Sequence, residues 1–214
     1  NEKADKKEGI HYLKVSIHNG NPRAMNSLGK ALYIGEGIEE NKKEAARYFK
    51  MSMDNGNSDG TYNYACCLFK GEGITSDKTE AIHIFEKLIT EVGHLHAMNQ
   101  LGFICSKGIG VSIDKERAVY YFKTAAQKGF PQSIYNYAVC LNNGIGVPIN
   151  KSEAFKYFKL AADKGHIQSI LLCGASYYHG NYVQLDNKKA AQYYKMAADK
   201  GKPEGMFSYS VMLY

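Results

Sequence analysis

A block of about 36 residues recurs along the chain, and this repetition limits the folds that the chain can adopt. The most recognisable part of this block is the stretch from Asp114 to Gly129, which reads DKERAVYYFKTAAQKG. It begins with a residue suited to cap a helix, places small and aromatic side chains on one helical face, and stops at a glycine. The corresponding glycines of all copies are Gly20, Gly56, Gly93, Gly129, Gly165 and Gly201. The chain is therefore an array in which each repeat packs mainly on its neighbours.

Each repeat predicts a different helix before this stretch and a glycine-bearing turn between the two helices. The turns read GEGI at 35–38 and 71–74, and GIGV at 108–111 and 144–147. Paired glycines supply the positive φ that a tight reversal needs. The fifth turn reads GNYV, with Tyr182 in place of the second glycine, so we expect it to follow a different path. The residues expected to cap the helix after each turn are Asn41, Asp77, Asp114, Asn150 and Asp186.

Small residues occupy one position of the first helix in every repeat. Glycine stands there at Gly29, Gly102 and Gly174. A glycine inside a helix costs roughly 1 kcal/mol relative to alanine. We therefore expect a neighbouring helix to approach so closely at these positions that no methyl group fits.

The period divides the chain into a single array of helix pairs, and we predict an all-α fold. A second-type helix without its partner occupies residues 1–20, and a first-type helix without its partner occupies residues 202–214. The last of these exposes apolar surface, so we expect the native protein to continue or its half-repeats to associate end to end. The full repeats are 21–56, 57–93, 94–129, 130–165 and 166–201.

With these positions aligned, the chain resembles the Sel1-like repeat family, a longer-period relative of the tetratricopeptide repeat. The best-matching copy is AMNQLGFICSKGIGVSIDKERAVYYFKTAAQKG, residues 97–129, and similar copies cover nearly the whole chain. The resemblance implies a right-handed α/α superhelix, an α-solenoid of antiparallel helix pairs, with the first helices on its concave side. It also implies a non-catalytic scaffold or adaptor that binds other proteins.

One cysteine-rich, secreted branch of that family carries a disulfide in each repeat and is linked to weak β-lactam binding or hydrolysis. Membership of this branch is the alternative function. The five cysteines of this chain are an odd number without repeat-periodic pairing, so they do not form such a ladder. They favour a reducing intracellular compartment, while the ER lumen and the extracellular space stay open.

Composition and motifs argue against several other classes of function. The net charge of +6 comes mostly from dispersed lysines, which are typical of a solvated surface, so a nucleic-acid partner is not favoured. No apolar run approaches the roughly 20 residues that span a bilayer, so membrane insertion is not expected. Catalytic motifs are missing, and His94 and His96 have no further ligand at a recognisable spacing. Neither enzyme activity, nor a cofactor, nor a metal is predicted.

Helical geometry gives the first helices a second face, opposite the positions that pack on neighbouring helices. This face is rich in Tyr, Phe, Asn and Gln and nearly lacks acidic residues, unlike a solvated helix surface. Aromatic rings can bury the side chains of an extended peptide, and amides can bond its backbone. The alternative is that these rings pack on one another across a narrow groove. The predicted partner-binding residues are Asn26, Tyr62, Asn63, Lys70, Asn99, Gln100, Phe103, Lys107, Tyr135, Asn136, Val139, Leu171, Tyr178 and Phe207.

Overall fold

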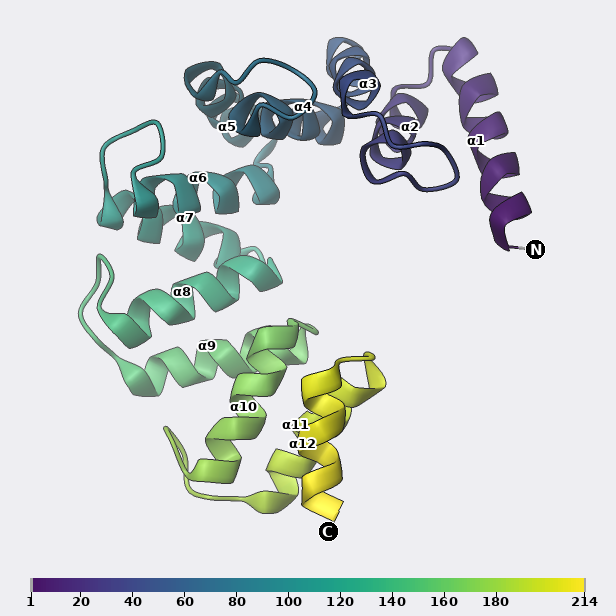
Figure 1. Ribbon diagram of the computed structural model, residues 1–214. Coiled ribbons are helices and arrows are strands. Elements are labelled where there is room, and N and C mark those ends of the chain that lie inside the picture. The colour runs from purple at the N-terminus through teal and green to yellow at the C-terminus, as the bar shows by residue number, and fades with distance from the viewer. Residues whose placement is uncertain (1, 214) are drawn as a thin grey trace. The chain divides into compact units, whose positions relative to one another are not determined.

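The structure, a computed structural model, describes residues 2–213, with side chains from residue 5 to residue 213. Over these residues it contains twelve α-helices and no strand, which confirms the predicted all-α class (Figure 1). We call the first helix of each repeat the A helix and the second the B helix. The A helices are α2 (Pro22–Ile34), α4 (Ser58–Lys70), α6 (Leu95–Lys107), α8 (Pro131–Asn143), α10 (Ile167–His179) and α12 (Pro203–Leu213). The B helices are α1 (Glu2–His18), α3 (Lys42–Asp54), α5 (Lys78–Val92), α7 (Lys115–Gln127), α9 (Lys151–Asp163) and α11 (Asn187–Asp199).

Packing divides the chain into two compact units, Asn1–Leu101 and Gly102–Tyr214, with the boundary inside α6. Within the first unit, α2 packs on α3, α3 on α4 and α4 on α5. Within the second unit, the same alternation joins each helix from α7 to α12 to the next one (Figure 1). An A helix such as α4 or α8 is thus held between the B helix of its own repeat and that of the preceding repeat, as expected for an array.

Helix boundaries follow the predicted capping pattern. Each predicted N-cap side chain of a B helix accepts a hydrogen bond from the backbone N–H three residues later, at 2.8–3.0 Å. All six glycines that end the B-helix stretches have positive φ, between 63° and 85°. This left-handed conformation suits glycine and stops a helix, so local sequence determines where each B helix begins and ends.

The glycine positions in the A helices are confirmed as sites of close helix approach. A Cβ atom at Gly29, Gly102 or Gly174 would lie 2.6–2.8 Å from a ring carbon on the B helix of the same repeat. The rings are Phe49, Phe122 and Tyr194, respectively. All three rings are buried. Because interiors are close-packed, each ring fills the space that the missing methyl group leaves.

Substitution of Gly102 by leucine should destabilise the fold, because the new side chain must displace Phe122. We expect Gly102→Leu to lower the free energy of unfolding by about 1–3 kcal/mol. The control Lys123→Ala changes an exposed residue of α7 and should stay within about 0.5 kcal/mol of the wild type. Urea unfolding followed by circular dichroism measures both variants. Equal unfolding midpoints for the two would contradict the close contact.

The second glycine of the inter-helix turn is needed for space as well as for conformation. Gly73 and Gly146 have φ of 78° and 66°. A Cβ atom at Gly73 would clash with the carbonyl oxygen of Lys42, and one at Gly146 would clash with that of Lys115. Each glycine therefore lets the turn rest on the backbone at the start of the preceding repeat's B helix.

The fifth turn corrects one expectation from the sequence. Tyr182 has φ of 67°, the left-handed conformation of the second glycine in the other turns, so the backbone does not take a different path. The turn also keeps their hydrogen bonding, because Asn181 N–H donates to the Ser176 carbonyl at 3.0 Å. The Tyr182 ring stacks on Phe155 at 6.0 Å between centroids, and its hydroxyl donates to Asn142 at 2.9 Å. These contacts offset the strain of a non-glycine residue in this conformation.

Two substitutions at Tyr182 separate the strain from the contacts. Tyr182→Gly loses the contacts and relieves the strain, whereas Tyr182→Ala loses the contacts and keeps the strain. We expect the alanine variant to be less stable than the glycine variant by about 1 kcal/mol in urea unfolding. In the helical control, Lys123→Gly should instead be less stable than Lys123→Ala by about 1 kcal/mol. The same order at both positions would contradict a strained Tyr182.

Candidate functional site

We define the A face as the side of the A helices that carries the predicted partner-binding residues. Exposure on this face differs from residue to residue more than the helical pattern indicates. The exposed side chains are Lys70, Phe103, Lys107, Tyr178 and Phe207. The half-buried ones are Tyr62, Asn63, Asn99, Gln100, Tyr135, Asn136, Val139 and Leu171. Asn26 is buried, so the residues of this set are not equally accessible to a partner.

Asn26 links two A helices. Only 6% of its surface is exposed, and its side-chain oxygen accepts a hydrogen bond from the Asn63 amide nitrogen at 2.7 Å. This bond joins α2 to α4, and little of the Asn26 side chain is accessible to a partner. The predicted direct contact between Asn26 and a partner does not fit this burial. A helical wheel misses such a link because it considers one helix at a time.

Two of the predicted aromatic residues connect consecutive repeats. Tyr62 stacks on His94 with 5.2 Å between ring centroids, and Tyr135 stacks on His166 with 4.6 Å. Each tyrosine also contacts a buried phenylalanine ring on the B helix of its own repeat. Such pairs of rings stabilise the contact between repeats beyond the area that they bury. These two tyrosines therefore have a structural role that does not depend on a partner.

The two histidines in these stacks cap the A helices that follow them. Nδ1 of His94 and of His166 accepts a backbone N–H three residues later, at 3.2 and 3.3 Å. Nε2 of each ring then faces the preceding A helix, at 3.4 Å from Asp59 and 3.1 Å from Gln132, respectively. Because Nδ1 of His166 accepts a hydrogen bond, its capping arrangement requires the neutral ring with its proton on Nε2.

This capping role of the two histidines is not predicted from the sequence pattern. A signal was present, because the two histidines directly follow glycines that end B-helix stretches. The equivalent residues of the earlier repeats, Asn21 and Asn57, cap α2 and α4 with their side chains. Histidine is not among the usual N-cap residues, so its type gives no such indication.

A hollow lies between α2 and α4 on the A face and has a volume of about 340 Å³. We call it the α2–α4 pocket. Its lining residues are Lys30, Tyr33, Ile34, Phe49, Asn63, Cys66, Cys67 and Lys70. The pocket brings together Asn63 and Lys70 of the predicted set, and its wall is mostly apolar.

A charged network borders the α2–α4 pocket. Glu72, in the turn after α4, accepts hydrogen bonds from the Tyr33 hydroxyl and from Lys42 Nζ, the latter at 3.3 Å. Lys70 Nζ lies 3.5 Å from the same carboxylate. The hydrogen bond from Tyr33 is the main cause of the lowered pKa of Glu72. The carboxylate is therefore ionised beside the pocket, and two lysines balance its charge.

The second unit exposes three aromatic side chains on its A helices. The exposed fractions are 43% for Phe103, 39% for Tyr178 and 70% for Phe207. Tyr135, by contrast, is half-buried against His166. Exposed rings on a surface are the groups that contribute most to protein interfaces when a partner covers them.

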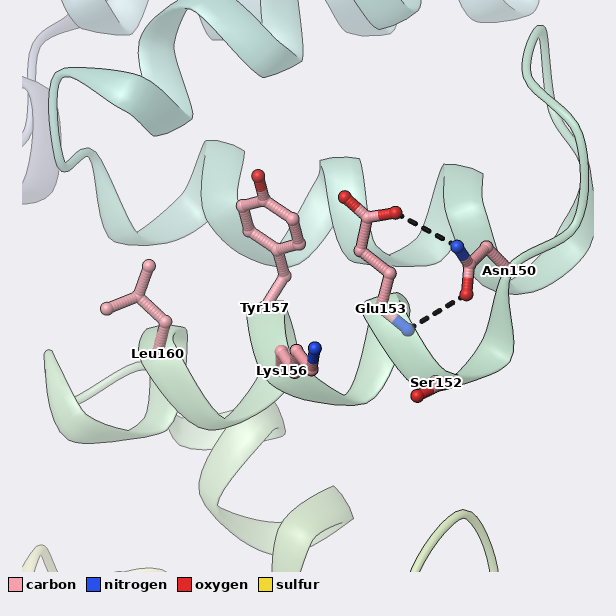
Figure 2. Close-up of a pocket in the computed structure, with 6 residues that line it drawn as sticks. All are labelled: Asn150, Ser152, Glu153, Lys156, Tyr157 and Leu160. Carbon is pink, nitrogen blue, oxygen red and sulfur yellow. Dashed lines mark hydrogen bonds between the residues drawn. The ribbon is translucent and has the colours of Figure 1, made fainter.

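A second hollow lies on a B helix, along α9, and has a volume of about 470 Å³ (Figure 2). Asn150 and Glu153 lie at one end of this hollow, at the N-terminus of α9. The side-chain oxygen of Asn150 accepts a hydrogen bond from the Glu153 backbone N–H, and its amide nitrogen donates to the Glu153 carboxylate, both at 3.0 Å. Tyr157 packs edge-on against Tyr137. Because these polar groups are engaged within the fold, the α2–α4 pocket is the better candidate for a ligand.

Other chemistry has little support in the described part of the chain. Over residues 5–213 no cluster of His, Cys, Asp or Glu is arranged to hold a metal ion. The cysteines form no disulfide there: Cys67, Cys105, Cys140 and Cys173 are buried thiols, and Cys66 is half-buried. None of the helices traced between residues 2 and 213 combines the length and apolar character that crossing a membrane requires.

Comparison with known proteins identifies one family. The family model described as Sel1 repeat matches residues 22–57, 58–90, 95–130, 131–166 and 168–202. A solved Sel1 repeat protein from Oxalobacter formigenes is similar, with 28% identity, a TM-score of 0.77, and coverage of 87% of this chain and 76% of that one. No curated protein sequence matches the chain significantly.

Two further solved structures share the fold. One is a protective antigen of uropathogenic Escherichia coli strains that displays an SLR fold, with 25% identity and a TM-score of 0.74. The match covers 96% of this chain but only 44% of the antigen. The other is an immunity protein from Pseudomonas aeruginosa, with 16% identity, a TM-score of 0.69, and coverage of 92% and 75%. At that identity the likeness concerns the fold alone.

The capping role of His166 predicts a pH-dependent stability. Burial lowers the pKa of His166, so below the ordinary histidine pKa of about 6.5 the unfolded chain binds a proton that the folded chain does not. The stability that this cap provides is present above that pH and is lost as the pH falls towards the lowered pKa of the folded state.

His166→Asn keeps a capping oxygen that does not titrate. Relative to this variant, the wild type should lose up to about 1 kcal/mol, the usual contribution of a cap, between about pH 7.5 and pH 5.5. Urea unfolding of both proteins at the two pH values measures the difference, and all other titrating groups are common to both. A constant difference would contradict the neutral cap.

Proposed function

Because the chain belongs to the Sel1 repeat family, we propose that it is a protein-interaction scaffold that binds an extended peptide or protein segment on the A face. Proteins of this family generally bind other proteins and are generally non-catalytic. The family gives the class of function, and the A face of this chain provides the surface for it.

The observation that carries the proposal is the exposure of Phe103 and Tyr178 on the A helices. Their helices already bury one stripe against B helices, so packing within the array does not account for rings on the other side. Large aromatic side chains are enriched at protein interfaces, where they contribute most of the binding energy. A partner that covers them would remove apolar surface from water.

The polar part of the face suits an extended chain. Asn63, Gln100 and Asn136 carry side-chain amides on A helices, and all three are half-buried. Amides positioned in this way can bond the backbone of a bound segment while rings contact its side chains. The enzyme-like alternative has no comparable support, because the cysteines of the described residues form no disulfide ladder.

Peptides selected from a random displayed library on the purified chain provide a probe for this surface. The triple variant Phe103→Ser, Tyr178→Ser, Phe207→Ser should weaken binding of selected peptides by about two orders of magnitude. Because these side chains are exposed, the variant should keep the unfolding midpoint of the wild type. Fluorescence anisotropy measures the affinity, and light scattering separates peptide binding from association of two copies through α12.

The control is Tyr121→Ser on α7, where the ring is 9% exposed and its hydroxyl accepts a hydrogen bond from Arg117. This variant should lower the melting temperature. If the triple variant unfolds while Tyr121→Ser does not, the A face is the packed side of the helices and the assignment of the binding surface is wrong. If the triple variant is folded and binds the selected peptides as the wild type does, the A face is not the site.

A further inference from the structure

The α2–α4 pocket has a chemistry of its own within the A face. Resting on the proposed scaffold function, we infer that it is a specificity pocket for one bulky apolar side chain of the bound segment, next to an acidic residue. Three properties of the pocket carry this inference: the composition of its wall, the charges at its mouth and a hydrogen-bond acceptor at its side.

The wall of the pocket suits an uncharged side chain. Ile34 is 63% exposed and forms part of it, together with the buried ring of Phe49. The thiols of Cys66 and Cys67 complete this surface, and burial raises the pKa of both, that of Cys67 to about 11. They are therefore uncharged at neutral pH. A pocket of about 340 Å³ is at the small end of ligand sites, which suits one side chain better than a whole cofactor.

The charges at the mouth favour a carboxylate beside that side chain. Lys30 and Lys70 line the pocket, and no acidic residue does. The carboxylate of Glu72, which borders the pocket, is engaged by Tyr33 and Lys42 as well as by Lys70. Lys30 is exposed and has no ion-pair partner among the described residues, so it is available to a partner's carboxylate.

Asn63 supplies a polar contact at the same place. Its amide nitrogen donates to Asn26, which orients the side chain. The Asn63 oxygen is then an acceptor for a backbone N–H of the bound segment, in the way that amides hold extended peptides. One apolar anchor, one charge pair and one backbone bond together define a short recognition element.

The charge of Lys30 is particular to this A helix. The next four residues at the same place in the repeat are Cys66, Phe103, Val139 and Ala175. A side chain needed for the stacking of repeats would recur at this position, as the glycines facing B helices do. A cation that stands at this position in one A helix alone instead fits a role in selecting the partner.

The selected peptides test this inference directly. Their sequences should be enriched in Leu, Ile, Met or Phe adjacent to Asp or Glu. Lys30→Glu should weaken binding of such a peptide about tenfold, because it replaces an attraction by a repulsion. Ile34→Ser should weaken it by a similar factor through loss of apolar contact. Both positions are exposed, so neither change should alter the unfolding midpoint.

Two controls make the test specific. Lys123→Glu changes the net charge equally but lies on α7, and it should leave the affinity unchanged. A peptide with its acidic residue replaced by lysine should bind Lys30→Glu more tightly than it binds the wild type. This exchange of preference requires direct pairing between residue 30 and the peptide.

The outcomes separate the pocket from the scaffold function. The specificity pocket is contradicted if the selected peptides show no acidic bias, or if they bind Lys30→Glu and Lys123→Glu equally. The scaffold function is still supported in that case if the triple variant loses binding. A selection that yields no binder to the A face overturns both.

Discussion

The contact between a glycine of the A helix and an aromatic ring of the B helix is the constraint on which the repeats depend. At Gly29, Gly102 and Gly174 the ring lies where a methyl group would be. The helices of a pair therefore approach closely along one stripe, and small residues recur there because nothing larger fits. This arrangement also places the opposite side of each A helix outside the packed interior. The A face is thus a consequence of how the pairs are packed.

Aromatic residues on the A face have two different roles, which depend on whether a residue at the start of the next A helix covers the ring. Tyr62 and Tyr135 are each followed by a capping histidine, His94 or His166, which covers the ring. Phe103 lies at another position along its A helix and stays exposed. Stacking and capping join consecutive repeats, whereas the uncovered rings carry the proposed binding function. In both roles an aromatic ring is stabilised by burial against another group, either within the protein or on a bound partner.

The polar groups around the α2–α4 pocket also have two roles: some bond within the protein, and others are available to a bound partner. Glu72 is held by Tyr33 and two lysines, so its charge is balanced within the protein. Asn63 uses its amide nitrogen within the protein and offers its oxygen at the pocket. Lys30 is exposed and forms no ion pair among the described residues. The network therefore supports the pocket wall and leaves a small set of groups for recognition, which is how specific sites combine rigidity with selectivity.

The sequence by itself determined the helix pairs, the N-caps of the B helices and the close glycine contacts, because each of these follows from a pattern within one repeat. It also indicated which side of the A helices faces away from the packing. Only the tertiary structure decided which residues of that side are accessible. Asn26 and Tyr62 are covered by groups from the following repeat, and Tyr182 keeps the glycine turn through contacts with the preceding one. Such contacts join residues 27 or more positions apart, which the periodicity of one helix does not describe.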